Sequence, residues 1–158
     1  MAAKKRDLPP NTKGAVRASK GARFDPIGFI RSTLKTRAGA PRQGSEGAPD
    51  AWLDVSASVA AGLDGLAVGD EIIVLTWLHK ARRDVLRVRP RSDRRRRLAG
   101  VFATRSPDRP NPVGLHRVVV RDIARNRLLI GPIEAIDGTP VIDIKPVLVG
   151  PGDPSRET

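Results

Sequence analysis

The sequence has no cysteine, few aromatic residues and no long apolar run among its 158 residues. The absence of cysteine excludes disulfides, thiolate zinc sites, iron–sulfur clusters and cysteine nucleophiles in one step. Because only two histidines are present as well, we expect no metal site. With three Phe, two Trp and no Tyr, stacking on several successive bases, as in an RNA-recognition sheet, is not expected either.

Membrane insertion and secretion are also not expected. No apolar run approaches the roughly 20 residues that a helix needs to span a bilayer. The N-terminus, MAAKKR, is positively charged but is not followed by the apolar segment of a secretory signal. We therefore predict a soluble, cytoplasmic protein with no membrane partner.

Acidic residues are fewer than basic residues. Lys and Arg number 29 against 17 Asp and Glu, which gives a net charge of +12 and a pI of about 11.4. Such a balance favours a polyanionic partner. The charge is concentrated in residues 1–23 and in the run RRRR at 94–97. The alternative is that these side chains only keep the protein solvated.

The length fits one domain of ordinary size. We predict a flexible basic N-terminal arm at 1–23, a folded domain at 24–149 and a polar C-terminal tail at 150–158. Within the domain, many short apolar segments alternate with turns, which is typical of an all-β barrel or sandwich with little helix. The expected strands are 27–33, 52–55, 71–78, 84–89, 115–122, 127–133 and 141–145, with a short helix at 58–66 and a return to the core at 100–102.

Four loops carry more charged and rigid residues than simple connections need. They are PRQ at 41–43, HK at 79–80, RSPDRPNPVGL at 105–115 and DGTP at 137–140. Three prolines stiffen the third loop while it displays Arg105, Arg109 and Asn111, and a rigid loop lowers the entropy cost of binding a ligand. The alternative is a stiff turn at a barrel rim. His79 either faces a pocket or is an ordinary hydrogen-bonding group.

Several known site types are absent. No G-x-G-x-x-G follows an expected strand, so a Rossmann-type dinucleotide or methyl-donor site is excluded. There is also no G-x-x-x-x-G-K-[ST] phosphate loop and no G-x-S-x-G nucleophile elbow.

Six segments of the sequence form a recognisable set. They are GFIRS at 28–32, APRQ at 40–43, LDGL at 63–66, VLTWLH at 74–79, TRSPDRPNPVGL at 104–115 and DGTPVIDIKP at 137–146. The R-S-P-x-R-P-N-P-[IV]-G-L segment is highly specific, and D-G-T-P and D-I-K-P follow it in the expected order. Together these segments resemble the TsaA-like family, whose best-understood members are the TrmO/YaeB tRNA methyltransferases, and the resemblance covers about residues 24–148.

The resemblance implies a small β-barrel that forms a homodimer and binds S-adenosyl-L-methionine between subunits. Members of the TrmO kind methylate N6 of threonylcarbamoyladenosine beside the tRNA anticodon. We expect substrate contacts at Arg109, Asn111 and Lys145. By the resemblance, cofactor contacts fall on Pro41, Arg42, Gln43, His79, Lys80, Arg105, Leu115, Asp137, Gly138, Thr139 and Pro140.

These side chains suit the chemistry of S-adenosylmethionine. Arg42 or Arg105 can pair with its carboxylate through a forked hydrogen bond. Asp137 can accept from the ribose hydroxyls or the amino group, the glycine of the 137–140 turn lets the backbone approach the adenine, and Leu115 offers an apolar wall. Methyl transfer is an in-line displacement that depends mainly on positioning the acceptor. His79 is the nearby candidate for a catalytic base near neutral pH, with cofactor contact as its other role.

Three functional interpretations follow. The first is an S-adenosylmethionine-dependent tRNA adenosine N6-methyltransferase. The second is the same barrel and cofactor acting on a different or small substrate, because the sequence stops at the barrel whereas longer TrmO proteins carry a further C-terminal domain. The third is a non-catalytic basic RNA-binding module. The loops at 105–115 and 137–140 favour the enzyme over the pure binder.

Overall fold

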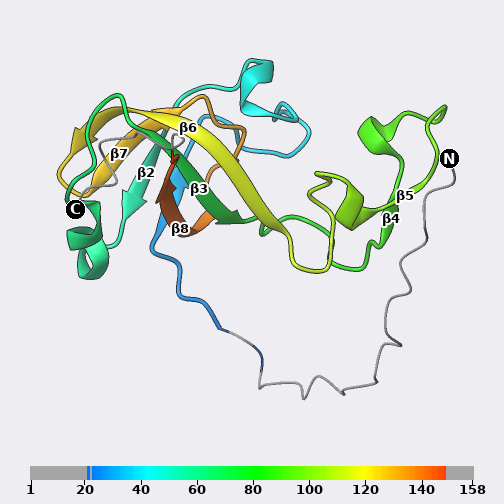
Figure 1. Cartoon of the computed structure of the whole chain (residues 1–158), viewed down its shortest axis with the longest axis horizontal. Coiled ribbons are helices and arrows are strands. Elements are labelled where there is room, and N and C mark those ends of the chain that lie inside the picture. The colour runs from blue at the N-terminus through cyan, green and yellow to red at the C-terminus, as the bar shows by residue number, and fades with distance from the viewer. Residues whose placement is uncertain (1–20, 22, 149–158) are drawn as a thin grey trace, which may run out of the picture.

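Six antiparallel strands close on themselves in the order β1-β2-β7-β6-β3-β8 (Figure 1). The computed structural model describes residue 21 and residues 23–148, so the predicted arm at 1–23 and tail at 150–158 lie almost wholly outside the described residues. The prediction of an all-β barrel with little helix is confirmed. The strands are β1 Gly28–Arg31, β2 Ala51–Val55, β3 Glu71–Trp77, β6 Val113–Ala124, β7 Arg127–Gly131 and β8 Pro140–Pro146.

Alternating apolar residues explain why these segments form a barrel. Along β3, Ile72 and Val74 are fully buried while their neighbours are partly exposed, as expected for a strand with one face on the core. Closure pairs every strand of the barrel on both sides and removes the open edges of a flat sheet. The interior is filled by small branched side chains, chiefly Ile30, Leu53, Ile72, Val74, Val118, Val120, Leu128, Ile130, Ile133 and Val141.

All helices in the described part of the chain are short 3-10 turns, and none is long and apolar enough to cross a membrane. The expected helix at 58–66 is a 3-10 helix, η2 Ala57–Leu63. The others are η1 Gly44–Glu46, η3 Pro90–Ser92 and η4 Val101–Ala103.

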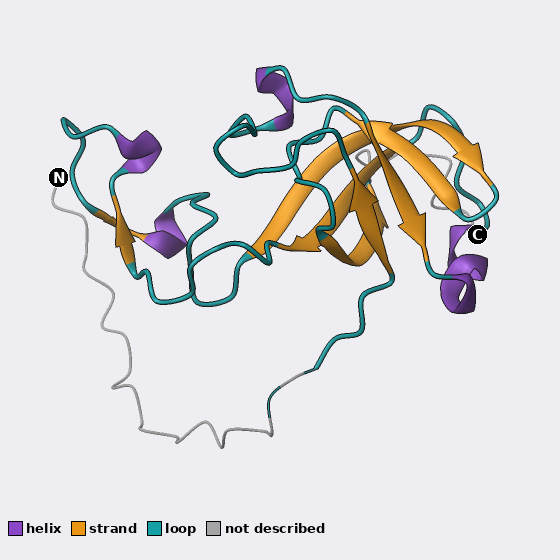
Figure 2. Cartoon of the chain, turned by 180° about the vertical axis from the view of Figure 1, so that it is seen from behind, coloured by secondary structure: helices purple, strands orange, loops and turns teal. Residues whose placement is uncertain are grey.

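The expected strand at 84–89 is largely wrong. Only β4 Arg87–Val88 is a strand, and it pairs with β5 Ala99–Gly100 in a separate two-stranded ribbon. The ribbon stands apart from the barrel with two of the 3-10 turns (Figure 2), so its alternating side chains have no core beneath them. The expected return to the core holds for Val101, which is buried, but not for Phe102, which is 81% exposed.

One end of the barrel gathers the four charged loops singled out in the sequence. In the antiparallel order, the C-terminal ends of β1, β3 and β7 meet the N-terminal ends of β2, β6 and β8 there. The connections 32–50, 78–112 and 132–139 all emerge at this end, which we call the loop end. The segment 78–112 between β3 and β6 includes the β4–β5 ribbon, and we call it the β3–β6 connection.

Candidate functional site

The four loops singled out in the sequence are joined at the loop end. Arg37, in the β1–β2 connection that also contains the 41–43 segment, links three of them. Its Nη1 donates to the Lys80 carbonyl at 3.1 Å, and its Nη2 lies 3.0 Å from Asp108 Oδ1. Asp108 also accepts from the Arg82 amide at 2.8 Å. Partial burial favours a higher pKa for Asp108, but these hydrogen bonds outweigh it and leave the pKa below its ordinary value.

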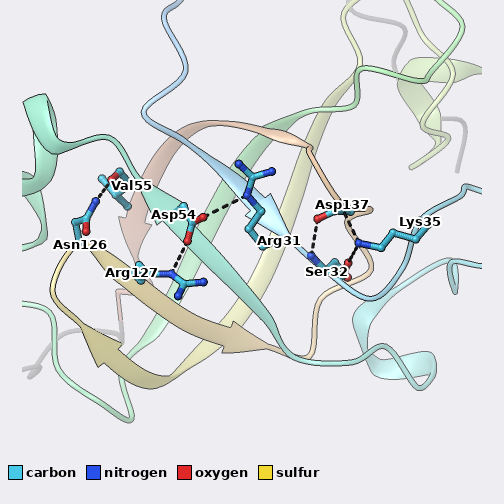
Figure 3. Close-up of polar contacts among 8 residues, drawn as sticks. All are labelled: Arg31, Ser32, Lys35, Asp54, Val55, Asn126, Arg127 and Asp137. Carbon is cyan, nitrogen blue, oxygen red and sulfur yellow. Dashed lines mark hydrogen bonds and ion pairs between the residues drawn. The ribbon is translucent and has the colours of Figure 1, made fainter.

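Asp137 joins the fourth loop to the end of β1 (Figure 3). Its Oδ1 accepts from the Ser32 amide at 3.0 Å, and its Oδ2 accepts from Lys35 Nζ at 2.9 Å. The Lys35 hydrogen bond, with help from Ser32, holds the pKa of Asp137 below its ordinary value of 3.8. The main chain continues this contact, because the Asp137 amide donates to Leu34 and the Gly138 amide donates to Ile30.

The third loop is held rigid by its own arginine as well as by its prolines. Arg109 Nη2 donates to the carbonyls of Val101 and Thr104, each at 2.6 Å, and Nε donates to Ser106 at 2.9 Å. The structure therefore gives Arg109 a role in loop geometry. Asn111 is exposed, and its Oδ1 accepts from Arg83 at 3.2 Å.

Several predicted contact residues remain open to a ligand. Arg42 and Arg105 are exposed, and neither forms an ion pair with another described residue. His79 and Lys80 are exposed as well, and partial burial together with the Lys80 charge lowers the pKa of His79. Leu115 is 48% exposed on β6. An open surface depression is lined by Phe102, Ala103, Thr104 and Arg105.

Lys145 is the predicted residue that the fold does not bring into this group. It lies on β8 opposite Ile73 and pairs with Asp143 at 2.8 Å. Because β8 begins at the loop end with Pro140 and rises about 3.3 Å per residue, Lys145 lies well along the barrel wall. Within residues 21 and 23–148, no group of three or more His, Asp or Glu side chains could hold a metal ion.

A buried polar chain at the loop end was missed by the sequence analysis. His116 Nδ1 donates to Glu134 Oε1 at 2.8 Å, and His116 Nε2 hydrogen-bonds the Thr76 hydroxyl at 2.8 Å. Burial favours a higher pKa for Glu134, but the bond from His116 outweighs it, and the pKa lies below its ordinary value. The sequence pattern could have indicated part of this chain, because His116 and Thr76 both occupy inward positions of strands in which buried and exposed residues alternate.

Other linking residues were missed too. Ser32, Lys35, Arg37 and Asp108 connect the loops but belong to no expected binding set. Asp108 lies inside the R-S-P-D-R segment, so its neighbourhood was marked. Nothing in the local sequence identifies Arg37, because its partners are about 40 to 70 positions away.

Comparison with known proteins identifies a family that this chain matches. The chain matches the model of the tRNA-methyltransferase O N-terminal domain over residues 29–150. A "Probable S-adenosyl-L-methionine-binding protein" of Methanothermobacter thermautotrophicus is 45% identical over 124 residues, covering 78% of this chain and 88% of the relative. An "S-adenosyl-L-methionine-binding protein" of Archaeoglobus fulgidus is 46% identical over 120 residues, covering 76% and 85%.

A solved structure agrees with this result. TrmO from Pseudomonas aeruginosa is similar with a TM-score of 0.65 and 30% sequence identity, over 81% of this chain and 56% of that chain. This chain thus spans a little over half the length of the solved TrmO chain. The fold and loops define a small closed β-barrel with a polar loop cluster at one end. The chain belongs to the family of the tRNA-methyltransferase O N-terminal domain, which confirms the resemblance drawn from the six segments.

The contacts of Asp137 predict a pH dependence of stability. Since its pKa is lowered in the folded state, its stabilising effect is present above the unfolded pKa of about 4 and is lost as pH falls through the folded value. Asp137→Asn should therefore be less stable than the wild type at pH 7, and this difference should shrink in acid. Denaturant unfolding at several pH values measures it.

The matched control is Asp64→Asn, because Asp64 is exposed and forms no ion pair with a described residue. It should change stability little at any pH. A stability difference for Asp137→Asn that stays constant from pH 7 into acid would contradict the assignment.

Proposed function

We propose that this protein is an S-adenosylmethionine-dependent methyltransferase that acts on tRNA, with N6 of threonylcarbamoyladenosine beside the anticodon as the acceptor. The observation that carries the proposal is the meeting of the family's four loops at one end of the barrel. Relatives that cover most of the same length are named as S-adenosyl-L-methionine-binding proteins, and the similar solved structure is a TrmO. A cytoplasmic location stays a prediction.

The methyl donor is proposed to bind at the loop end. Arg42 and Arg105 each offer a guanidinium with no competing ion pair among the described residues, so either can take the donor carboxylate in a bidentate contact. Asp137 keeps unused lone pairs on both oxygens, because a carboxylate can accept about four hydrogen bonds. It can therefore accept from a ribose hydroxyl or an amino group without losing Lys35.

The 137–140 turn suits the adenine end of the donor. Gly138 has φ 78°, and nothing lies within 4 Å of the position that a Cβ would take. The backbone at this glycine is thus accessible to a flat ring. Thr139 is buried and its hydroxyl donates to Ile136, so its contribution is through the main chain. Leu115 offers an exposed apolar wall, and Pro41, Gln43, Lys80 and Pro140 complete the proposed contact set.

Catalysis is proposed to rest on positioning. The acceptor nitrogen attacks the methyl carbon while the opposite carbon–sulfur bond breaks, and S-adenosylhomocysteine leaves as a neutral thioether, so the protein must mainly align the acceptor with that bond. The acceptor also loses a proton. The lowered pKa of His79 keeps its imidazole neutral at physiological pH, which suits a proton acceptor. Arg109, Asn111 and Lys145 stay predictions as substrate contacts, with Arg109 acting through the shape of its loop.

We also propose that the site is completed in a homodimer. The depression next to Arg105 is open to solvent in the single chain, and Leu115 and Phe102 leave apolar surface exposed there. A second subunit could cover this surface and enclose the donor. Sedimentation at micromolar concentration separates the two cases, because a fully active monomer is incompatible with a shared site.

Donor binding should depend on the free guanidinium groups. If Arg42 or Arg105 pairs with the donor carboxylate, replacing that arginine by alanine should weaken binding of S-adenosylmethionine by about 1–3 kcal/mol, the usual range for a charge-assisted hydrogen bond. Calorimetry with S-adenosylmethionine and S-adenosylhomocysteine measures it. Arg87→Ala is the matched control, because Arg87 is an exposed arginine on the separate ribbon. No detectable binding of either ligand to the wild type would refute the donor assignment.

Methyl transfer to tRNA should be visible by mass. Incubation with S-adenosylmethionine and tRNA that carries threonylcarbamoyladenosine should add one methyl group to that nucleoside, detected after digestion. Unmodified tRNA should stay unchanged, because the acceptor is absent. If the donor binds but no tRNA nucleoside gains mass, the tRNA assignment fails and the small-substrate interpretation takes its place.

The basic ribbon should contribute to tRNA affinity through phosphate contacts. Arg94 and Arg97 are exposed and form no ion pair with a described residue. Replacing both with serine should make the dependence of log affinity on log salt less steep by about one unit, since each neutralised phosphate contributes roughly 0.7 in single strands. Donor affinity should stay the same.

The control removes the same charge elsewhere. Arg121→Ser with Arg125→Ser removes two positive charges, one from the C-terminal part of β6 and one from the β6–β7 turn. This turn lies at the far side of the molecule from β4 and β5 (Figure 1), and the weak 3.9 Å ion pair of Arg121 with Asp50 is lost in the variant. Equal changes in salt slope for both double variants would show that only net charge matters and would remove the phosphate contacts from the ribbon.

A further inference from the structure

Thr76, His116 and Glu134 form a hydrogen-bonded chain at the loop end of the barrel. Thr76 is fully buried and His116 is 5% exposed. Their links measure 2.8 Å from Thr76 Oγ1 to His116 Nε2 and 2.8 Å from His116 Nδ1 to Glu134 Oε1. Because a carboxylate only accepts, Nδ1 carries a hydrogen. The threonine hydroxyl can rotate to donate to Nε2, so both ring nitrogens are satisfied.

Such a chain is unusual at these positions. Inward residues of β3 and β6 are otherwise apolar or glycine, as with Ile72, Val74 and Val118. A buried polar group costs free energy unless it is hydrogen-bonded, and three apolar side chains of similar shape could fill the same space. The chain is therefore not explained by core filling, and it suggests a need for directional contacts at this place.

The glycines around the chain fit its side chains closely. A Cβ on Gly114, within the P-N-P-V-G-L segment, would stand 2.7 Å from His116 Nε2 and would also collide with the Thr76 hydroxyl. A Cβ on Gly44 would stand 2.6 Å from the Pro132 carbonyl and 3.4 Å from Glu134 Oε2. Backbone on both sides thus packs directly against the chain. The Gly44 amide also helps to lower the pKa of Glu134.

Each member of the chain lies beside one of the proposed donor-binding segments. Gly44, which packs against Glu134, directly follows Gln43. His116 directly follows Leu115. Thr76 lies near the end of β3, three residues before His79 in the turn that follows this strand, and Glu134 comes three residues before Asp137. A shift at any link would therefore move the start or end of a donor-binding loop.

We infer that Glu134 and His116 are positioning residues for the methyl donor: through Thr76 and the backbone of Gly44 they hold the 41–43 segment, the start of β6 and the end of β3 at a fixed separation. This inference rests on the proposed function. It assigns these residues no contact with the reacting atoms. Their effect is transmitted to the donor through Gln43, Leu115 and His79.

Two variant pairs test the inference. Glu134→Ala removes the link to His116 and the packing against Gly44, whereas Glu134→Gln keeps the side-chain shape and one oxygen that can accept from His116 Nδ1. Thr76→Val removes the hydroxyl but keeps the branched shape, whereas Thr76→Ser keeps the hydroxyl. We expect about tenfold weaker binding of S-adenosylhomocysteine for Glu134→Ala and Thr76→Val, and near wild-type binding for their partners, because small displacements of positioning groups have large effects.

A matched stability control separates positioning from general loss of structure. Val120→Ala opens space in the barrel core at a residue outside the chain, and it should lower the melting temperature while leaving the dissociation constant of S-adenosylhomocysteine unchanged. All constants are measured well below the melting temperature of each variant. Thr76→Val is the mildest change, so it provides the comparison even if Glu134→Ala fails to fold.

The outcomes distinguish this inference from the proposed function. If the wild type binds S-adenosylhomocysteine and Thr76→Val binds it equally well, the positioning role is overturned while the donor site stands. If Val120→Ala weakens binding as much as Thr76→Val does, the effect is one of stability and the positioning role is again overturned. If the wild type does not bind the ligand at all, the proposed function fails and this inference fails with it.

Discussion

The barrel depends on the contact that closes it, where the turn at 137–140 runs beside β1. Only two residue pairs join β1 and β8 in regular register. The seam is extended by main-chain hydrogen bonds from Ile30 to Thr139 and from Gly138 to Ile30, and then by the Asp137 carboxylate on Ser32 and Lys35. The D-G-T-P segment thus helps to close the barrel as well as belonging to the proposed donor site. A ligand bound to this turn would therefore contact the seam that closes the barrel.

This double role changes how the segment is interpreted. In sequence, Asp137 is an acid in a turn and suggests a hydrogen bond to a ligand. In the structure, its two oxygens already have protein partners, and Gly138 provides the exposed backbone. In the proposed site, binding and stability therefore depend on the same few residues. The R-S-P-D-R-P-N-P segment follows the same rule, because Asp108 and Arg109 hold the loop while Arg105 points to no acidic partner among the described residues.

Local sequence patterns were sufficient for the barrel and insufficient for its loops. The apolar, β-branched run at 71–78 and the apolar segment at 115–122 predicted strands, and both form. Apolar and charged residues alternate at 84–89, yet no core lies beneath this segment, and only Arg87–Val88 forms a strand. Whether one face of a strand is covered depends on the three-dimensional fold and not on the local sequence. The same limit applies to Arg37, whose partners Lys80 and Asp108 are distant in sequence, and to Lys145, which a strand carries away from the motif that marked it.

The alternation of inward and outward positions along β6 could have identified His116 as a buried residue. It follows Gly114 and precedes Val118 at inward positions of β6, and Thr76 continues the inward series of Ile72 and Val74. A polar residue in an inward series predicts a buried partner, although the partner itself, Glu134, lies in a loop with no such pattern. The pairing of His116 with Glu134 needs the three-dimensional structure.

The closing seam also joins segments that are far apart in the sequence. Ser32 and Asp137 are 105 residues apart in the chain, so their contact requires closure of a loop that contains almost the whole barrel. Contacts this distant in sequence are associated with slow folding. The proposed donor site includes this seam, so it is complete only when the last strand has joined the first. Occupancy of that site by a ligand would therefore report that the barrel has closed.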